Sequence, residues 1–299
     1  MQAHERHERR LAWALAAPAL GLSAAVTAFP LLWVLWDSFH RHDLRMPWLG
    51  HPFVGLENYA ELLSDARFWE AASHTLFFVA VTVSAELLLG LLLALGLHAE
   101  FRGRGWARTA ALLPWALPTV VAALVWRFLF EGRGGFVNVV LLALGILERP
   151  PVWFADPVLA WVPLLLADIW KATPFVALLL LAGLQGIDPA LYEAARVDGA
   201  SRWEEFRHVT LPLLRPALLV ALVFRTLDAL RVFDLVYVLT NGGPGTATEP
   251  LALYTFRVLF QNLRFGLGSA LSFVLFALSF ALALVYVHTV GRGVLGGGR

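Results

Sequence analysis

The chain has 299 residues, of which 59% are hydrophobic and 15% are charged, and its formal net charge at pH 7 is +1. Soluble globular domains are typically about 45–50% apolar and about 25% charged. The composition, together with a mean hydropathy of +0.69, therefore indicates a membrane protein. The near-zero net charge excludes a strongly basic nucleic-acid-binding protein. The lack of cysteine excludes disulfides, thiolate metal sites and a cysteine nucleophile.

Six apolar segments are long enough to cross a membrane, since a spanning helix needs about 20 mostly apolar residues. They cover residues 11–36, 71–98, 109–130, 157–184, 213–239 and 267–290. Apolar residues lie on all sides of these helices, as contact with lipid and with a helix bundle requires. The sequence therefore predicts an all-α polytopic membrane protein with six transmembrane helices.

Loop charges predict the orientation. An even number of spans puts both termini on one side, and arginines favour cytoplasmic loops. With the termini inside, the inner segments carry more arginines than the outer ones, and the short turn between the second and third spans holds Arg102, Arg104 and Arg108. We therefore expect both termini in the cytoplasm.

The predicted organisation follows from these spans. A cytoplasmic tail covers residues 1–10, the first helix 11–36 and an outer loop 37–70. A core of five helices covers 71–290 and includes a cytoplasmic loop at 185–212, and a second cytoplasmic tail covers 291–299. The first span has features of a signal peptide, but its apolar run exceeds the 7–15 residues of a signal h-region, so we expect an uncleaved helix.

The cytoplasmic loop begins with the signals of a short helix. Asp188 is a typical N-cap residue, and Pro189 suits the first helical position. Gly199 can adopt the left-handed conformation that ends a helix. These signals predict a helix between Asp188 and Gly199.

A second short helix is predicted next. Ser201, followed three residues later by Glu204, forms a capping box. Pro212 is expected to end this helix before the fifth span. The loop should therefore present a helix–turn–helix to the cytoplasm.

This loop also carries apolar and small residues that a loose connector rarely needs. The apolar ones are Leu191, Val197, Trp203, Phe206 and Val209. Ala194, Ala195 and Ala200 would let the backbone of a partner approach closely, and Glu193 could cap or pair with a partner group. The loop is either a docking surface for a partner protein or an interfacial helix on the lipid headgroups.

The loop resembles a known family. Residues 193–195, 198–200 and 211–212 read Glu-Ala-Ala, Asp-Gly-Ala and Leu-Pro, which resembles the EAA loop of permeases of binding-protein-dependent ABC importers. Further stretches resemble the carbohydrate branch, in particular the first permease of maltose- and trehalose-type systems, at 55–59, 113–115, 170–175, 233–234 and 239–244. The resemblance covers roughly residues 10–290 and implies a type I ABC importer permease fold.

The resemblance implies a role for the loop and a set of partners. In this family the loop is a coupling helix that sits in a cleft of the ATPase subunit. The residues expected to couple to the ATPase are Glu193, Ala194, Ala195, Asp198, Gly199, Ala200, Trp203 and Phe206. The expected partners are a second permease subunit in a heterodimer, an ATPase dimer, an extracytoplasmic sugar-binding protein and membrane lipid, with no nucleic acid.

The chain lacks the Gly-x-x-x-x-Gly-Lys-Ser/Thr sequence of an ATPase. We therefore expect no catalytic residue, metal or cofactor on this chain, with ATP and Mg²⁺ bound by the partner ATPase. The expected location is the cytoplasmic (inner) membrane of a bacterium or archaeon.

Charged residues within the fourth and fifth spans form a candidate substrate path. A charge at mid-bilayer costs about 2.5–3.5 kcal/mol and usually faces a cavity or a partner. From the helix rise of 1.5 Å per residue, Asp168 lies about 16 Å from the outer end of its span and Arg225 about 18 Å from the inner end. The candidate residues are Asp168, Lys171, Ala172, Phe175, Arg225, Asp228 and Ala229.

Such a path suits a sugar, because carboxylates and guanidinium bind hydroxyls while Phe175 or Trp170 packs on the ring. Alternatively the charges only neutralise one another. Arg225, Asp228, Arg231 and Asp234 alternate in sign every three residues, and Asp168 could pair with Arg225. Glu86 on the second span stands isolated and is given either a packing or a gating role.

The glycine-rich stretch 241–245 is not a phosphate-binding loop, because it follows a membrane helix and lacks the Lys-Ser/Thr ending. It is either a flexible outer loop or a contact for the binding protein.

The predicted function is that of a permease subunit in an ATP-driven importer of a di- or oligosaccharide such as maltose or trehalose, working by alternating access. The alternatives are an ion-coupled secondary transporter that uses Asp168 and Asp228, and a membrane enzyme that uses the same carboxylates. The lack of a visible internal repeat counts against a secondary transporter.

Overall fold

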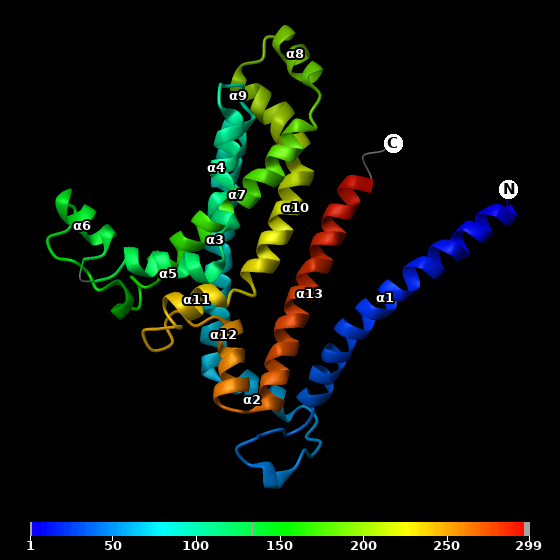
Figure 1. Ribbon diagram of the computed structural model, residues 1–299, viewed down its shortest axis with the longest axis vertical. Coiled ribbons are helices and arrows are strands. Elements are labelled where there is room, and N and C mark those ends of the chain that lie inside the picture. The colour runs from blue at the N-terminus through cyan, green and yellow to red at the C-terminus, as the bar shows by residue number, and fades with distance from the viewer. Residues whose placement is uncertain (1, 133, 296–299) are drawn as a thin grey trace. The chain divides into compact units, whose positions relative to one another are not determined.

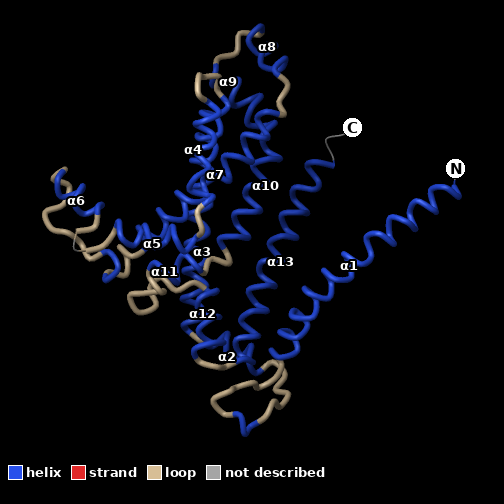
Figure 2. Tube along the Cα trace, viewed as in Figure 1, coloured by secondary structure: helices blue, strands red, loops and turns tan. Residues whose placement is uncertain are grey.

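The computed structural model describes residues 2–132 and 134–295, and within them the chain forms helices joined by loops, with no strand (Figure 1, Figure 2). The chain divides into two compact units. One comprises the first 66 residues and 255–277, and the other comprises 67–254 and the C-terminal part from 278.

The first unit begins with α1, Gln2–Ser38, whose apolar stretch contains no buried residue. Because the helix starts at Gln2, the described part of the expected tail 1–10 is helical. Residue 1 and residues 296–299, the ends of the two expected tails, lie outside the described residues. The unit continues with η1 (Pro47–Leu49), α2 (Glu57–Ser64), the π-helical η4 (Arg257–Gln261) and the first turns of α13 (Phe265–Leu295).

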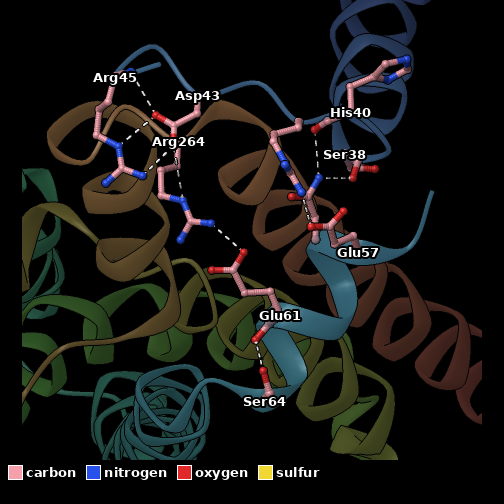
Figure 3. Close-up of polar contacts among 10 residues, drawn as sticks. Ser38, His40, Asp43, Arg45, Glu57, Glu61, Ser64 and Arg264 are labelled. Carbon is pink, nitrogen blue, oxygen red and sulfur yellow. Dashed lines mark hydrogen bonds and ion pairs between the residues drawn. The ribbon is translucent and has the colours of Figure 1, made fainter. Parts of the chain in front are cut away.

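The loop after α1 is held by polar contacts, several of which Figure 3 shows. The buried Asn58 of α2 donates from Nδ2 to the backbone oxygens of Ser38 and His40, at 2.8 and 3.0 Å. The N–H of Gly266, at the start of α13, donates to the His42 oxygen at 3.0 Å. A Cβ at Gly266 would lie 2.2 Å from the His40 oxygen, so the close approach requires glycine.

The second unit contains the remaining helices. In chain order they are α3 (Ala66–His98), α4 (Arg104–Ala116), α5 (Thr119–Leu129), α6 (Phe136–Ala143), η2 (Trp153–Ala155), α7 (Trp161–Gln185), α8 (Pro189–Val197), α9 (Arg202–Glu205), the π-helical η3 (Phe206–Thr210), α10 (Leu211–Ala229), α11 (Asp234–Leu239) and α12 (Leu251–Phe256).

The core of this unit lies where α3, α7 and α10 pack together, and two glycines permit the close contact. A Cβ at Gly90 of α3 would lie 2.5 Å from a methyl of Val176 on α7. A Cβ at Gly183 of α7 would lie 2.7 Å from the Cβ of Ala217 and 2.9 Å from Leu214, both on α10. Buried apolar side chains from all three helices fill the rest of this contact.

Five helices among the described residues are long and apolar enough to span a membrane, and a bent pair brings the number up to six. The predicted all-α architecture is therefore confirmed. The bent pair corrects the third span, which we expected to be one helix over 109–130. α4 and α5 meet at 90°. The break falls at Leu117 and Pro118, because a proline disfavours the helical conformation of the residue before it and cannot donate a helical hydrogen bond.

The fifth span also differs from the prediction of one helix over 213–239. α10 ends at Ala229, and a separate helix, α11, begins at Asp234. Of the non-helical residues 230–233 between them, Arg231, Val232 and Phe233 line the cavity described below.

Candidate functional site

A cavity of about 500 Å³ lies in the second unit, bounded by α4, α5, α7, α10 and the start of α11. All seven residues of the predicted substrate path line it. They are Asp168, Lys171, Ala172, Phe175, Arg225, Asp228 and Ala229. The structure therefore brings together residues from α7 and α10 that the sequence only placed at similar depths.

The polar centre of the cavity wall is Arg225, which is itself buried. Its Nε and Nη2 donate to the two carboxylate oxygens of Glu86 on α3, at 2.5 and 2.9 Å. Nη2 also donates to Asp168 of α7 at 3.1 Å, and Nη1 donates to Asp228 at 2.5 Å. One guanidinium thus joins carboxylates from three helices, in the two-pronged geometry that makes arginine–carboxylate pairs strong.

The prediction that Glu86 is isolated is wrong. Its side chain is fully buried and pairs with Arg225 through both oxygens. A single carboxylate in an otherwise apolar span was a signal for such a partner, because an unpaired buried charge is very costly. The sequence does not identify which arginine that partner is.

The carboxylates of this cluster differ in their access to the cavity. The Asp228 side chain is 69% exposed, whereas that of Asp168 is 15% exposed. Asp228 therefore faces the cavity with most of its surface, while Asp168 lies against the protein and helps to orient Arg225.

The sign alternation from Arg225 to Asp234 is only partly used for pairing. Arg225 and Asp228 form an ion pair, and so do Arg225 and Asp168. Lys171, Arg231 and Asp234 also line the cavity but have no ion-pair partner within 4.0 Å among the described residues. Mutual neutralisation thus accounts for the inner part of the cluster and leaves these three charges available.

Aromatic rings form another part of the lining. The Phe175 ring stacks on Trp115 at a centroid distance of 5.7 Å and meets Phe224 edge-on at 6.4 Å. Trp115, from α4, and Phe224 both line the cavity, and only the fold places them there. Trp170, the other candidate for packing on a sugar, is not on this lining and packs on Trp126 at 5.9 Å.

The predicted start of the loop over residues 185–212 is confirmed. The Asp188 carboxylate caps α8 by accepting from the Ala190 N–H at 2.9 Å, and Pro189 is the first residue of the helix. Gly199 follows with a φ of +83°, in the left-handed region. Asp198 and Gly199, two of the predicted coupling residues, are exposed.

The capping box is also confirmed. The Ser201 Oγ accepts from the Glu204 N–H at 3.4 Å, and the Glu204 carboxylate accepts from the Ser201 N–H at 2.7 Å. The hydrogen bond from that N–H, followed by the serine hydroxyl, lowers the pKa of the Glu204 carboxyl below its ordinary value.

The prediction that Pro212 ends the second helix is wrong. α9 continues through the π-helical turn η3 into α10, so one helix extends from Arg202 to Ala229. In this turn the Leu211 N–H donates to the Phe206 oxygen, five residues back. Proline is tolerated early in a helical segment, where its missing N–H is not needed, and the change of hydrogen-bond register puts Pro212 in that position.

Two contacts join α8 to the start of the following helix, and no sequence motif indicates either of them. Arg196 of α8 forms an ion pair with Glu205 at 2.8 Å, and the Tyr192 hydroxyl lies 3.0 Å from the Thr210 hydroxyl. These contacts hold α8 against the start of the long helix. The Glu205 carboxylate raises the pKa of the Arg196 guanidinium through the hydrogen bond between them.

The loop presents a surface of apolar and small residues. Val197 is 88% exposed and Trp203 67% exposed, and the Trp203 ring stacks on Phe206 at 5.5 Å. Of the other predicted coupling residues, Glu193 and Ala194 are exposed, and Ala195, Ala200 and Phe206 are half-buried. Such a surface is what a protein partner requires for close contact.

The glycine-rich loop at 241–245 is anchored by its neighbouring residues. Thr248 is buried and donates to the Gly243 oxygen at 2.8 Å. The buried carboxylate of Glu249 accepts two hydrogen bonds from Arg67, at 2.7 and 2.9 Å, and Arg67 also lies over the Tyr254 ring. The expectation of a flexible loop therefore misses these anchoring contacts.

Comparisons with known proteins agree with this architecture. Residues 86–292 match the family described as the binding-protein-dependent transport system inner membrane component. The chain is 44% identical to the trehalose/maltose transport system permease protein MalF of Thermococcus litoralis, over 95% of both chains. It is 42% identical to the trehalose transport system permease protein SugA of Mycobacterium tuberculosis, over 97% of this chain and 92% of the relative.

A solved structure has the same fold. A chain of a bacterial ABC transporter involved in the import of the acidic polysaccharide alginate aligns with a TM-score of 0.83 at 23% identity, covering 98% of this chain and 99% of that chain. Together with the family match, this confirms the predicted type I importer permease fold. The chain therefore belongs to the family of binding-protein-dependent transport system inner membrane components, and it is a multi-pass permease subunit rather than an enzyme.

Proposed function

We propose that this permease carries a di- or oligosaccharide, such as maltose or trehalose, through the cavity between α7 and α10. The observation that carries the proposal is the composition of the cavity wall. Hydroxyl-binding charges and stacked aromatic rings lie side by side in about 500 Å³. That combination suits a sugar, whose hydroxyls bind charged groups and whose apolar face packs on an aromatic ring.

The relatives support the same substrate class. The names of two of them specify trehalose or maltose, and a third, 41% identical, is a sulfoquinovosyl glycerol transport system permease of Agrobacterium fabrum. These solutes share a sugar ring, which is the group that Phe175 and Asp228 would contact. The comparisons give no support to the ion-coupled alternative, so Asp168 and Asp228 are assigned to the sugar and to Arg225.

The loop formed by α8 and α9 would be the handle for a separate ATPase. Ala194, Val197 and Trp203 of this loop are exposed, and its second helix is continuous with α10 as far as Ala229. Trp203 and Arg225 are therefore on one helix, about 33 Å apart at 1.5 Å per residue. A displacement of the loop by the ATPase would therefore move Arg225 and the carboxylates that pair with it.

Alternating access follows from that linkage. ATP would close an ATPase pair, bring the coupling loops together and open the cavity outward to a loaded sugar-binding protein, and hydrolysis would reset it. The bias comes from the preference of ATP for the closed state. We assign both termini to the cytoplasm, ATP and Mg²⁺ to the ATPase alone, and no cofactor to the transport site of this chain.

The assembly would be completed by a second permease in a heterodimer, two ATPase copies and an extracytoplasmic binding protein. One solved neighbour is an alginate transporter in complex with a periplasmic protein bound to an alginate pentasaccharide. The single loop of this chain offers one ATPase copy one docking site, so a second permease would supply the other.

Co-purification tests the coupling role. The complex, expressed with its candidate ATPase and second permease, should retain the ATPase in stoichiometric amount. Glu193→Ala and Gly199→Val should reduce the bound ATPase at least tenfold, whereas Glu148→Ala, an exposed glutamate outside the loop, should not. A chain that transports without any ATPase would overturn the proposal.

Uptake tests the sugar site. In reconstituted vesicles with the matching binding protein, Asp228→Ala and Phe175→Ala should each lower sugar uptake at least tenfold while the complex stays intact. Trp170→Ala, which removes an aromatic ring outside the cavity lining, should leave uptake within twofold. A screen with labelled maltose, trehalose and related glucosides identifies the substrate. Normal kinetics in both cavity variants would contradict the assignment.

A further inference from the structure

A second cluster of functional side chains lies in the first unit and has no part in the proposed transport site. Asp37, His42 and His51 each offer one ligand atom, and these atoms lie within 4.8 Å of one another. None of the three lines the cavity that contains Arg225. They are two imidazoles and one carboxylate, a set that binds transition-metal ions in many proteins.

The fold brings these residues together from distinct segments. Asp37 is on the last turn of α1, and His42 and His51 lie on the two arms of the loop that follows. The arms are paired, since the Arg41 N–H donates to the Pro52 oxygen at 2.9 Å. The pairing places the His42 and His51 rings against each other, with centroids 3.9 Å apart.

The backbone of His42 is fixed as well. Its oxygen accepts from the Gly266 N–H at 3.0 Å, and the next residue, Asp43, forms a bridge with Arg264. His42 is therefore held from both sides, by the returning arm of the loop and by the segment that leads into α13. A fixed ligand of this kind needs little ordering when an ion binds.

Asp37, unlike the other acidic residues nearby, is not paired with an arginine among the described residues. Figure 3 shows Arg45 paired with Asp43 and Arg264 paired with Glu61. Nη2 of Arg45 lies 2.5 Å from Oδ2 of Asp43, and Nη2 of Arg264 lies 2.6 Å from Oε2 of Glu61. The hydrogen bond from Arg45 lowers the pKa of Asp43. Arg41 is paired in the same way with Glu57.

Asp37 instead faces histidine and serine. Its Oδ1 lies 2.9 Å from Nδ1 of His42, and its Oδ2 accepts from the Ser269 hydroxyl of α13 at 3.0 Å. The carboxylate is 2% exposed and has no arginine partner among the described residues. A buried carboxylate that is oriented by a hydroxyl and directed at an imidazole has the support that metal ligands commonly have.

The spacing fits a tetrahedral ion after a small adjustment. Metal–ligand bonds of about 2.0–2.2 Å put tetrahedral ligand atoms about 3.4 Å apart. Nδ1 of His42 and Oδ1 of Asp37 are already closer than that. His51 is exposed, so its ring can turn inward, and the fourth position would hold water.

We propose that Asp37, His42 and His51 form a binding site for a single Zn²⁺ ion. Zinc is chosen because two imidazoles and one carboxylate suit it, whereas Ca²⁺ and Mg²⁺ need more oxygen ligands. On binding, the ion would take the place of the hydrogen bond between His42 and Asp37. It would join the end of α1 to both arms of the loop and so stiffen this part of the first unit.

Metal content tests the site directly. The purified complex, stripped with chelator and then titrated with Zn²⁺, should take up one ion per permease chain with an affinity that His42→Ala and His51→Ala each weaken at least tenfold. His98→Ala, an exposed histidine outside the cluster, is the matched control and should change nothing. Co²⁺ in place of Zn²⁺ should give the visible absorption bands of a four-coordinate site, and these bands should be lost in His51→Ala.

A stability readout separates binding from misfolding. His51 is exposed, so His51→Ala should fold normally and have the melting temperature of the stripped wild-type complex. Zn²⁺ should raise the melting temperature of the wild type and leave that of His51→Ala unchanged. Equal zinc uptake by the wild type and His51→Ala, or no uptake by either, would overturn the proposal, and neither result would bear on sugar transport.

Discussion

The loop formed by α8 and α9 and the Arg225 cluster are built on opposite principles. In the loop, Ser201 and Glu204 bond each other three residues apart, and Arg196 and Glu205 pair across nine. In the cluster, Arg225 reaches Glu86 across 139 residues of sequence and Asp168 across 57. The loop is exposed and the cluster is buried. The capping contact follows from a three-residue motif and is readable from sequence, whereas the Arg196–Glu205 pair and the long-range contacts of the core depend on the fold.

The two regions also differ in energy. Removing a helix cap at a surface costs about 0.5–2 kcal/mol. Removing one partner from a buried ion pair costs about 3–5 kcal/mol, because a charge remains unpaired in the core. This difference suits their proposed roles, since a docking loop must adapt to a partner while a substrate site must hold its charges in place.

The largest effect is expected from breaking the cluster. Glu86→Ala removes both hydrogen bonds to Nε and Nη2 of Arg225 and should lower the free energy of unfolding by about 3–5 kcal/mol. Denaturation of the detergent-purified complex measures it, and Glu100→Ala, at an exposed glutamate, serves as the control. A loss below about 1 kcal/mol would show that the buried pair is not the main stabilising contact.

A double-mutant cycle sharpens the same point. If Glu86 and Arg225 act as a unit, the effects of Glu86→Ala and Arg225→Ala should fall short of additivity by at least about 1 kcal/mol. Additive effects would mean that Asp168 and Asp228 alone fix the guanidinium.

The next effect concerns the turn of the loop. Gly199 has a φ of +83°, so Gly199→Ala should cost about 1–2 kcal/mol of local stability. Hydrogen exchange of the α8 amides measures this local opening. The control is Gly105→Ala in α4, where an added Cβ meets nothing within 4 Å, and it should have no such cost. Unchanged exchange in Gly199→Ala would mean that the loop tolerates another turn.

A smaller effect is expected at the cap. Ser201→Ala removes the acceptor for the Glu204 N–H and should cost about 1 kcal/mol, observed as faster exchange in the first turn of α9. Ser73→Ala is a suitable control, since this exposed serine lies inside α3 and caps nothing. Equal exchange rates in Ser201→Ala and the wild type would assign the stability of α9 to the Arg196–Glu205 pair instead.

The smallest effect is the pH dependence of this cap. The pKa of Glu204 is lower in the folded loop than in the unfolded chain, so ionised Glu204 stabilises the folded form. This contribution is fully present above the ordinary glutamate pKa of about 4.3. It is lost as the pH falls through the lowered value. Loop exchange measured from pH 6 to pH 3 should show the loss, and Glu204→Gln should abolish that pH dependence.

Several parts of the molecule were predictable because neighbouring residues determine them. The start of α8 is marked by Asp188, the turn by Gly199 and the start of α9 by the Ser201–Glu204 box. Each of these signals depends only on the backbone within three residues of it. Long apolar runs predict the spanning helices for the same reason. Family motifs added the expected type I fold, which the comparisons confirm.

Other parts required the fold. Pro212 does not end its helix, because the π-helical turn before it shifts the hydrogen-bond register so that the missing N–H of the proline is not needed. Whether such a turn forms depends on how α9 and α10 join. The third span breaks at Leu117 and Pro118, although apolar composition alone predicts one helix. The C-terminal end of the predicted fifth span separates as α11, which helps to shape the cavity.

The sequence by itself determined that this protein is a membrane protein with a capped loop between its fourth and fifth spans, because composition and helix caps act locally, and the motifs of that loop gave the resemblance to importer permeases. Only the tertiary structure decided that Glu86 belongs with Arg225, that Trp115 and Phe224 share a wall with Phe175, and that Asp37 lies beside His42 and His51. These groups come from separate segments. Their meeting depends on the packing of helices, which requires close approach at residues such as Gly90 and Gly266 and buries charges only where partners arrive from elsewhere in the chain.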